Sequence, residues 1–137
     1  LKPIKLPQTP EHVEVTALGD RSGNICYISF LESYSCENAD LSVSASADIY
    51  TEHSTISDYV DIDYPSNMDD SSIYTTEDYT SASGETWKII TTTNASDDSY
   101  DSIDAYQVKD TISYRIGVSY PGDQKNKARA TLLELLK

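Results

Sequence analysis

Residues 41–49, LSVSASADI, alternate strictly between apolar and small polar side chains. Successive side chains of a β-strand point to opposite faces of the sheet. The segment therefore predicts a strand with one face packed on a core and the other face wet or covered by small side chains. A chain with such a strand must build a sheet and cover at least one of its faces.

Other segments repeat this two-residue pattern and are separated by short polar turns, such as those at Gly23-Asn24 and Gly84. Short turns between consecutive strands favour antiparallel pairing. The expected strands are 13–18, 25–30, 41–49, 72–80, 85–93, 103–109 and 111–120.

Two segments change to helical spacing. In residues 55–64 the apolar side chains recur at intervals of three, four and eight, and Pro65 ends the pattern. The second helix is expected from about residue 124 to the end, capped by Asp123. Its apolar stripe consists of Ala128, Leu132, Leu135 and Leu136, with Leu133 on the flank. The sequence thus predicts an α+β fold, an antiparallel sheet packed with two helices.

The chain of 137 residues is long enough for one domain with its own core. Residues 1–12, rich in Pro, Lys and Gln, are expected to form an arm or linker, and residues 13–137 a single α+β domain. The net charge of −13 disfavours nucleic acid as a partner, since it repels phosphates. No apolar stretch approaches the roughly 18 residues that a transmembrane segment needs, so none is expected.

The two cysteines, Cys26 and Cys36, lie ten residues apart. If residues 25–30 and 34–38 pair as a hairpin about Leu31-Glu32-Ser33, the two cysteines lie across from each other, and a disulfide closing so short a loop would add about 2–3 kcal/mol of stability. Two reduced, buried thiols are equally compatible with the sequence.

A polar stretch, SDDSYDSID, gathers four acidic residues that are candidate metal ligands: Asp97, Asp98, Asp101 and Asp104. Clustered oxygen ligands suit Ca²⁺. The spacing is not that of an EF-hand and the turn glycine is missing, so a solvated acidic loop is the alternative.

Tyrosine is the commonest aromatic residue, with eleven copies against one Phe and one Trp. Tyr50, Tyr74 and Tyr79 are candidates for surface contacts, because an exposed Tyr can stack on a sugar ring or serve a protein interface. Alternatively, Tyr takes the place of Phe as a core residue.

The sequence contains no serine-hydrolase elbow, phosphate-binding loop or zinc-protease motif. Its two histidines, His12 and His53, are expected to be exposed rather than catalytic. Abundant carboxylates leave open a hydrolase that uses a pair of acids at glycosidase separation.

Four segments follow one another in the order known from a protein family: LSVSASADIY, STISDYV, SGETWKIITTT and YRIGVSYPGDQKNKARATLLELL. Together they lie within residues 41–137, and residues 13–30 fit loosely. The chain resembles the PsbP-like family, the extrinsic photosystem II protein and its bacterial lipoprotein relatives. The resemblance implies an α/β/α sandwich and a secreted or cell-envelope location, with a lipid anchor before Leu1. It implies no catalytic residue and no cofactor.

The expected function is therefore that of a non-enzymatic binding or accessory module, secreted or at the cell envelope, with a protein or glycan as partner. The alternative is a carbohydrate- or calcium-binding adhesion module. A carboxylate-dependent hydrolase is the third hypothesis.

Overall fold

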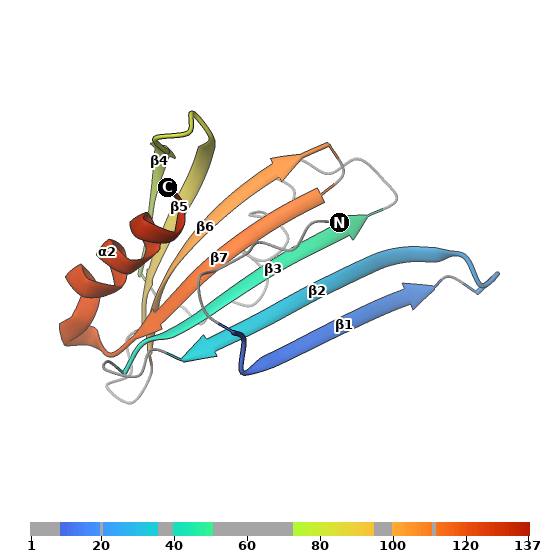
Figure 1. The fold of residues 1–137 in the computed structure, drawn as a ribbon, viewed down its shortest axis with the longest axis horizontal. Coiled ribbons are helices and arrows are strands. Elements are labelled where there is room, and N and C mark those ends of the chain that lie inside the picture. Colours follow the sequence, from blue (N-terminus) through green and yellow to red (C-terminus); the bar gives the residue numbers. More distant parts are fainter. Residues whose placement is uncertain (1–8, 20, 36–39, 51–72, 95–99, 111) are drawn as a thin grey trace.

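A computed structural model describes residues 9–19, 21–35, 40–50, 73–94, 100–110 and 112–137 (Figure 1). These residues form seven strands, a 3-10 turn and one α-helix. The elements are β1 (His12–Gly19), β2 (Ile25–Ser35), β3 (Ser42–Tyr50), β4 (Ile73–Thr80), β5 (Thr86–Thr93), β6 (Asp101–Lys109), β7 (Ile112–Tyr120), η1 (Gly122–Gln124) and α2 (Lys125–Leu135).

The strands build one antiparallel sheet in the order β1-β2-β3-β7-β6-β5-β4. Strands β1 to β3 form one meander and β4 to β7 a second. The two meanders meet where β3 pairs with β7, from Ser42 opposite Ser119 to Ile49 opposite Ile112. The sheet therefore has two edges, β1 and β4, which lie far apart in space (Figure 1).

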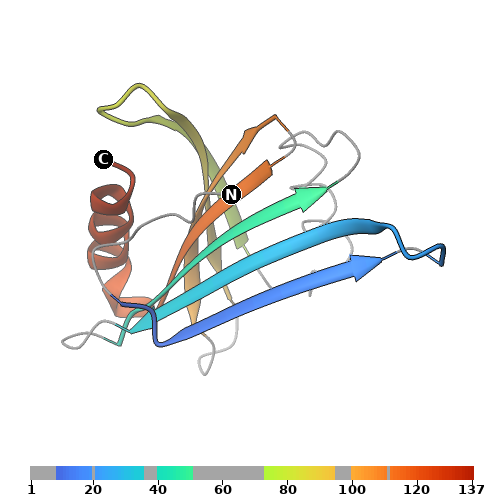
Figure 2. The same ribbon diagram turned by 45° about the vertical axis from the view of Figure 1, so that its right-hand side comes forward.

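The helix α2 lies against one face of the twisted sheet, where it contacts β6 and β7 (Figure 2). We call this side the helix face. The alternation of β3 places Val43, Ala45 and Ala47 on it, and all three are buried as the sequence predicted. The core between sheet and helix consists of Tyr34, Leu41, Val43, Ala45, Trp87, Ile89, Ile103, Ala105, Ile116, Val118, Tyr120, Ala128, Leu132 and Leu136.

The opposite face of the sheet carries a partly buried ion pair. Arg115 of β7 donates to Oδ1 of Asp104 on β6 through Nη2 at 2.7 Å and Nε at 3.0 Å. Gly117 lies opposite Asp104 in the ladder, and a Cβ atom there would overlap that carboxylate. Glycine inside a strand marks a close approach of this kind.

The predicted fold class is wrong. The described residues form mostly antiparallel sheet with one short helix at the C-terminal end, not an α/β/α sandwich with two helices. The segment 55–64, for which we predicted the first helix, lies outside the described residues. The second helix is present, but Asp123 does not cap it. It lies inside η1, and neither η1 nor α2 has a side-chain cap.

The hairpin about Leu31-Glu32-Ser33 is not formed, because β2 runs unbroken from Ile25 to Ser35. β1 and β3 pair with it on both sides through this region. Glu32 lies on the helix face of β2, and the Tyr34 hydroxyl donates a hydrogen bond to its carboxylate. The Glu32 carboxylate therefore has a hydrogen-bond partner within the strand, so a charged residue at this position is compatible with a continuous β2.

Candidate functional site

A pocket of about 280 Å³ lies where the end of α2 meets the turn between β4 and β5. Its apolar lining comes from Trp87, Tyr114, Ile116, Leu135 and Leu136. Its polar lining comes from Ser83, Glu85, Gln107, Lys109 and Lys137. The volume is close to the lower end of the range for small-molecule sites, about 300–1,000 Å³.

The sheet brings these residues together from separate parts of the sequence. Gln107 and Tyr114 are opposite each other in the β6–β7 ladder, so both point to the helix face. Trp87 reaches the same face from β5, and the last turn of α2 adds Leu135 and Leu136 from above. The pocket is thus a gap in the core layer at the end of the helix.

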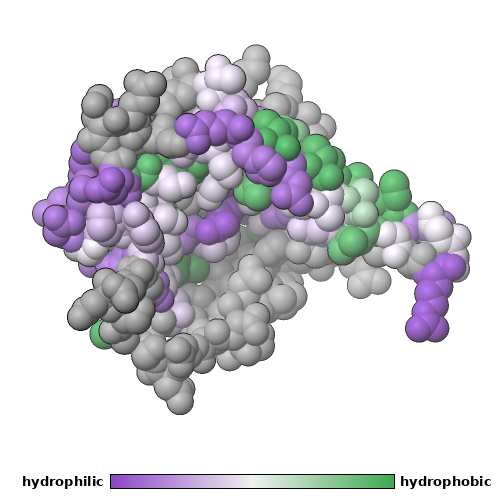
Figure 3. Space-filling view, turned by 90° about the horizontal axis from the view of Figure 1, so that it is seen from below, coloured by the Kyte–Doolittle hydropathy of each residue, from purple (hydrophilic) through white to green (hydrophobic). Residues whose placement is uncertain are grey.

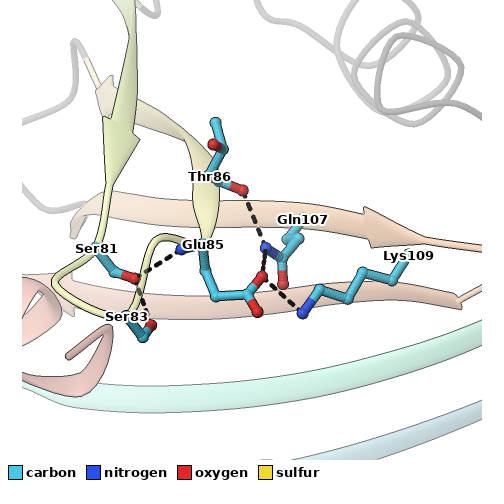
Figure 4. A network of polar contacts seen from close by, with 6 residues as sticks. All are labelled: Ser81, Ser83, Glu85, Thr86, Gln107 and Lys109. Atoms are coloured by element: carbon cyan, nitrogen blue, oxygen red, sulfur yellow. Dashed lines mark hydrogen bonds and ion pairs between the residues drawn. The ribbon is translucent and has the colours of Figure 1, made fainter.

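A network of polar contacts surrounds Glu85 at the rim of this pocket (Figure 4). Its Oε2 atom accepts from Nζ of Lys109 at 2.6 Å and from Nε2 of Gln107 at 2.9 Å. The same Gln107 nitrogen donates to the backbone oxygen of Thr86 at 3.1 Å. Both side chains of β6 are therefore held in fixed positions beside the pocket.

The turn that carries Glu85 is itself closed by hydrogen bonds. The backbone N–H of Gly84 donates to the oxygen of Ser81 at 2.9 Å, and Gly84 has a positive φ of 85° that favours glycine. The Ser81 hydroxyl accepts from the backbone N–H of Glu85 at 3.2 Å and lies 2.7 Å from the Ser83 hydroxyl. These hydrogen bonds fix the backbone position of Glu85.

The hydrogen bonds from Lys109 and Gln107 hold the pKa of Glu85 below its ordinary value. The carboxylate is therefore ionised near neutral pH and forms an ion pair with the Lys109 ammonium. The other cation at the rim, Lys137, is likewise paired, with Glu134. The charges around the pocket are balanced by their neighbours.

Trp87 is 9% exposed and is the single tryptophan of the chain. Its Nε1 atom is buried and has no hydrogen-bond partner among the described residues. Such a donor is uncommon in protein interiors. Trp87 lies in the segment 85–93, which the sequence predicted to be a strand.

The candidate calcium ligands do not come together at one point. Asp101 and Asp104 lie in β6 rather than in a loop, three residues apart, so they face opposite sides of the sheet. Asp101 accepts from the backbone N–H of Asn94 at 2.9 Å, and Asp104 is paired with Arg115. Asp97 and Asp98 lie outside the described residues. Within the described ranges, no three His, Cys, Asp or Glu residues are grouped so that they could hold a metal ion.

The candidate surface tyrosines have different positions. Tyr79 is partly buried and packs against the core, beside Trp87 on the neighbouring strand. Tyr74 is half-buried in β4, and the side chain of Tyr50 is outside the described residues. Tyr100, which the sequence analysis did not single out, is 56% exposed.

The hairpin on which the pairing of Cys26 with Cys36 depended is not formed, because β2 is continuous. Cys36 and the side chain of Cys26 lie outside the described residues.

α2 is too short and too polar to cross a membrane, so the described part of the chain has no candidate membrane-spanning helix. No family model matches the sequence. No curated protein matches it either.

Proposed function

We propose that the chain is a non-enzymatic binding module, secreted or at the cell envelope, that takes a small amphipathic ligand in the pocket beneath the end of α2. The observation that carries the proposal is the combination of an apolar wall with a fixed polar rim. Ligand sites typically join an apolar lining to a few well-placed polar groups in this way.

The polar rim favours an uncharged ligand. Glu85 and Lys109 neutralise each other at 2.6 Å, and Lys137 is paired with Glu134. A charged ligand would have to break one of these pairs. A hydroxyl or an amide of the ligand could instead share hydrogen bonds with the Glu85 carboxylate, the Gln107 amide or the Ser83 hydroxyl.

A glycan is the more specific candidate within this class. Trp87 and Tyr114 supply aromatic surface to the pocket, and Gln107 and Glu85 supply planar hydrogen-bonding groups. Sugars combine apolar faces with hydroxyl edges, which match these two kinds of lining. A two-carboxylate hydrolase finds no support in the pocket. Glu85 is the one acid among its described lining residues, and its pKa is lowered rather than raised.

The single tryptophan makes the test direct, because the intrinsic fluorescence of the protein reports on the pocket. The protein is titrated with neutral mono- and disaccharides and, in parallel, with small uncharged aromatic amides. We expect a saturable change in Trp87 emission with at least one class, and a dissociation constant about tenfold weaker in Gln107→Ala.

Lys88→Ala is the matched control, since Lys88 follows Trp87 in β5 but points away from the helix face to pair with Asp78. It should leave the titration unchanged. A flat titration with every probe, or equal binding by Gln107→Ala and the parent protein, would rule out the pocket as the binding site.

A further inference from the structure

Among the described residues, the outer edge of β1 is the less protected of the two edges of the sheet. Val13 and Val15 are 48% and 63% exposed on the helix face of this strand. Seen from below, from the side of β1, apolar side chains gather along one side of the molecule (Figure 3). Proteins usually protect such edges with Lys, Pro, bulges or a covering segment. Between His12 and Leu18 the strand has no Lys and no Pro, and its irregularity comes only at Leu18/Gly19.

The opposite edge, β4, is protected by charge. Glu77 and Asp78 lie at the centre of that strand. Glu77 is paired with Arg129 at 2.7 Å, and Asp78 with Lys88 at 3.5 Å. A second strand added to β4 would bring its own groups against these acids, whereas β1 has a single acid, Glu14.

The sequence of β1 is complementary to itself. In an antiparallel pair centred on Val15, that residue opposes its own copy and Val13 opposes Ala17 of the second chain. Glu14 then opposes Thr16, not another Glu14, so no like charges face each other. Within one chain the Thr16 hydroxyl already donates to Glu14 at 3.2 Å, and the same donor can serve the Glu14 of the second copy.

We infer that the chain forms a symmetric dimer in which β1 pairs antiparallel with β1 of a second copy, centred on Val15. The two sheets then join edge to edge, and the exposed valines of the two helix faces form one continuous apolar strip. A second copy of the chain supplies this match at each of the five positions from Val13 to Ala17. The interface is small, so we expect half-dissociation at about 10–100 μM.

Sedimentation velocity between about 5 μM and 1 mM measures the dimer directly, and Val15→Lys should weaken it by at least about tenfold. The matched control is Ile73→Lys, which places the same charge on an exposed apolar residue, 68% exposed, of the other edge. It should leave the dimer intact. Each lysine makes the net charge of −13 less negative by one and so reduces the long-range repulsion between two copies. Loss of the dimer in Val15→Lys therefore cannot come from net charge.

Hydrogen exchange of the unmodified protein is the second measurement and needs no variant. Amides of residues 12–19 should gain protection as the concentration rises through the dissociation range, while those of 73–80 should not. A chain that is monomeric at 1 mM would overturn the inference. A dimer that persists in Val15→Lys, or β1 protection that is independent of concentration, would overturn it as well.

Discussion

At Glu85, one carboxylate oxygen accepts hydrogen bonds from two side chains of the same strand, Gln107 and Lys109. These bonds lower the pKa of the carboxyl group, Lys109 contributing most. A group whose pKa is lower in the folded state stabilises that state above its unfolded pKa. The contribution is lost as the pH falls through the folded pKa.

For Glu85→Gln we expect the parent protein to be the more stable of the two at pH 7. Since the ordinary pKa of Glu85 is 4.5, the difference should begin to shrink below about that pH and vanish once the carboxyl group is protonated. Urea unfolding of both proteins from pH 3 to pH 7 measures it, and all other acids cancel in the comparison. A difference that is the same at pH 3 and pH 7 would show that the ion pair has no effect on stability.

Tyr120 is fully buried, yet its hydroxyl has no hydrogen-bond partner among the described residues. Burial and the nearby Asp101 and Asp104 raise its pKa, so the hydroxyl stays neutral. Tyr120→Phe removes this unsatisfied group and keeps the ring, so unfolding free energy should stay the same or rise by up to about 1 kcal/mol.

Tyr34→Phe is the contrasting variant, because the Tyr34 hydroxyl donates to Glu32. It should lower the unfolding free energy by about 1–2 kcal/mol. Chemical denaturation of the three proteins compares the two hydroxyls. A clear loss of stability in Tyr120→Phe would mean that its hydroxyl has a partner in solution.

Between elements, Asp104 of β6 and Arg115 of β7 are joined by an ion pair at 2.7 Å. Gly117 leaves room for the Asp104 carboxylate, and Ser44 of β3 borders the same space. Gly117→Ala should push the carboxylate away from Arg115 and lower the unfolding free energy by about 2 kcal/mol. In an Asp104→Ala background the same change should have a much smaller effect, which a double-mutant cycle measures. Equal effects in both backgrounds would exclude this mechanism.

The strands could largely be predicted from local alternation, because one face of each is buried. The serine-rich pattern of 41–49 placed Val43, Ala45 and Ala47 correctly on the core side. The continuity of β2 could not be predicted, since it depends on pairing with β1 and β3 and on the bond between Tyr34 and Glu32. The strand order could not be predicted from local sequence patterns either, because β3 and β7 are far apart in the chain.

The candidate site was missed for the same reason. Trp87, Gln107 and Leu136 come from three separate elements, and no local spacing connects them. The abundance of acidic residues suggested a calcium site instead. Two of the candidate ligands, Asp101 and Asp104, point to opposite faces of β6. One signal was available: Gln107 is a polar residue at a position where the alternation of β6 places a buried side chain. A buried polar group of this kind needs partners, and here they are Glu85 and Thr86.

Over the whole molecule, acids and bases are separated along the sequence, but the fold brings some of them together as ion pairs. From Ser22 to Val108 there are seventeen acids and one base, Lys88. The ion pairs between later bases and acids of this middle region include, among the described residues, those of Lys109 with Glu85, Arg115 with Asp104 and Arg129 with Glu77. These pairs offset only part of the repulsion that a net charge of −13 creates.

Added salt should therefore stabilise the protein. Raising NaCl from about 20 mM to 500 mM at pH 7 should increase Tm by about 3–6 °C, because the Debye length falls below the spacing of the exposed acids. Calorimetry measures the change. At the isoelectric point of about 4.2 the same salt step should have little effect. A Tm that falls with salt at pH 7 would mean that the attractive pairs outweigh the repulsion.

The pairing of β3 with β7 also affects the order in which the sheet can form during synthesis. β7, which pairs with the second edge of β3, is translated about sixty to eighty residues after β3. α2 follows β7. While the ribosome makes the intervening chain, the nascent meander of β1 to β3 has an open edge at β3 and an apolar side without its helix. We therefore expect slow refolding, because the β3–β7 pairing joins segments that are far apart in the sequence.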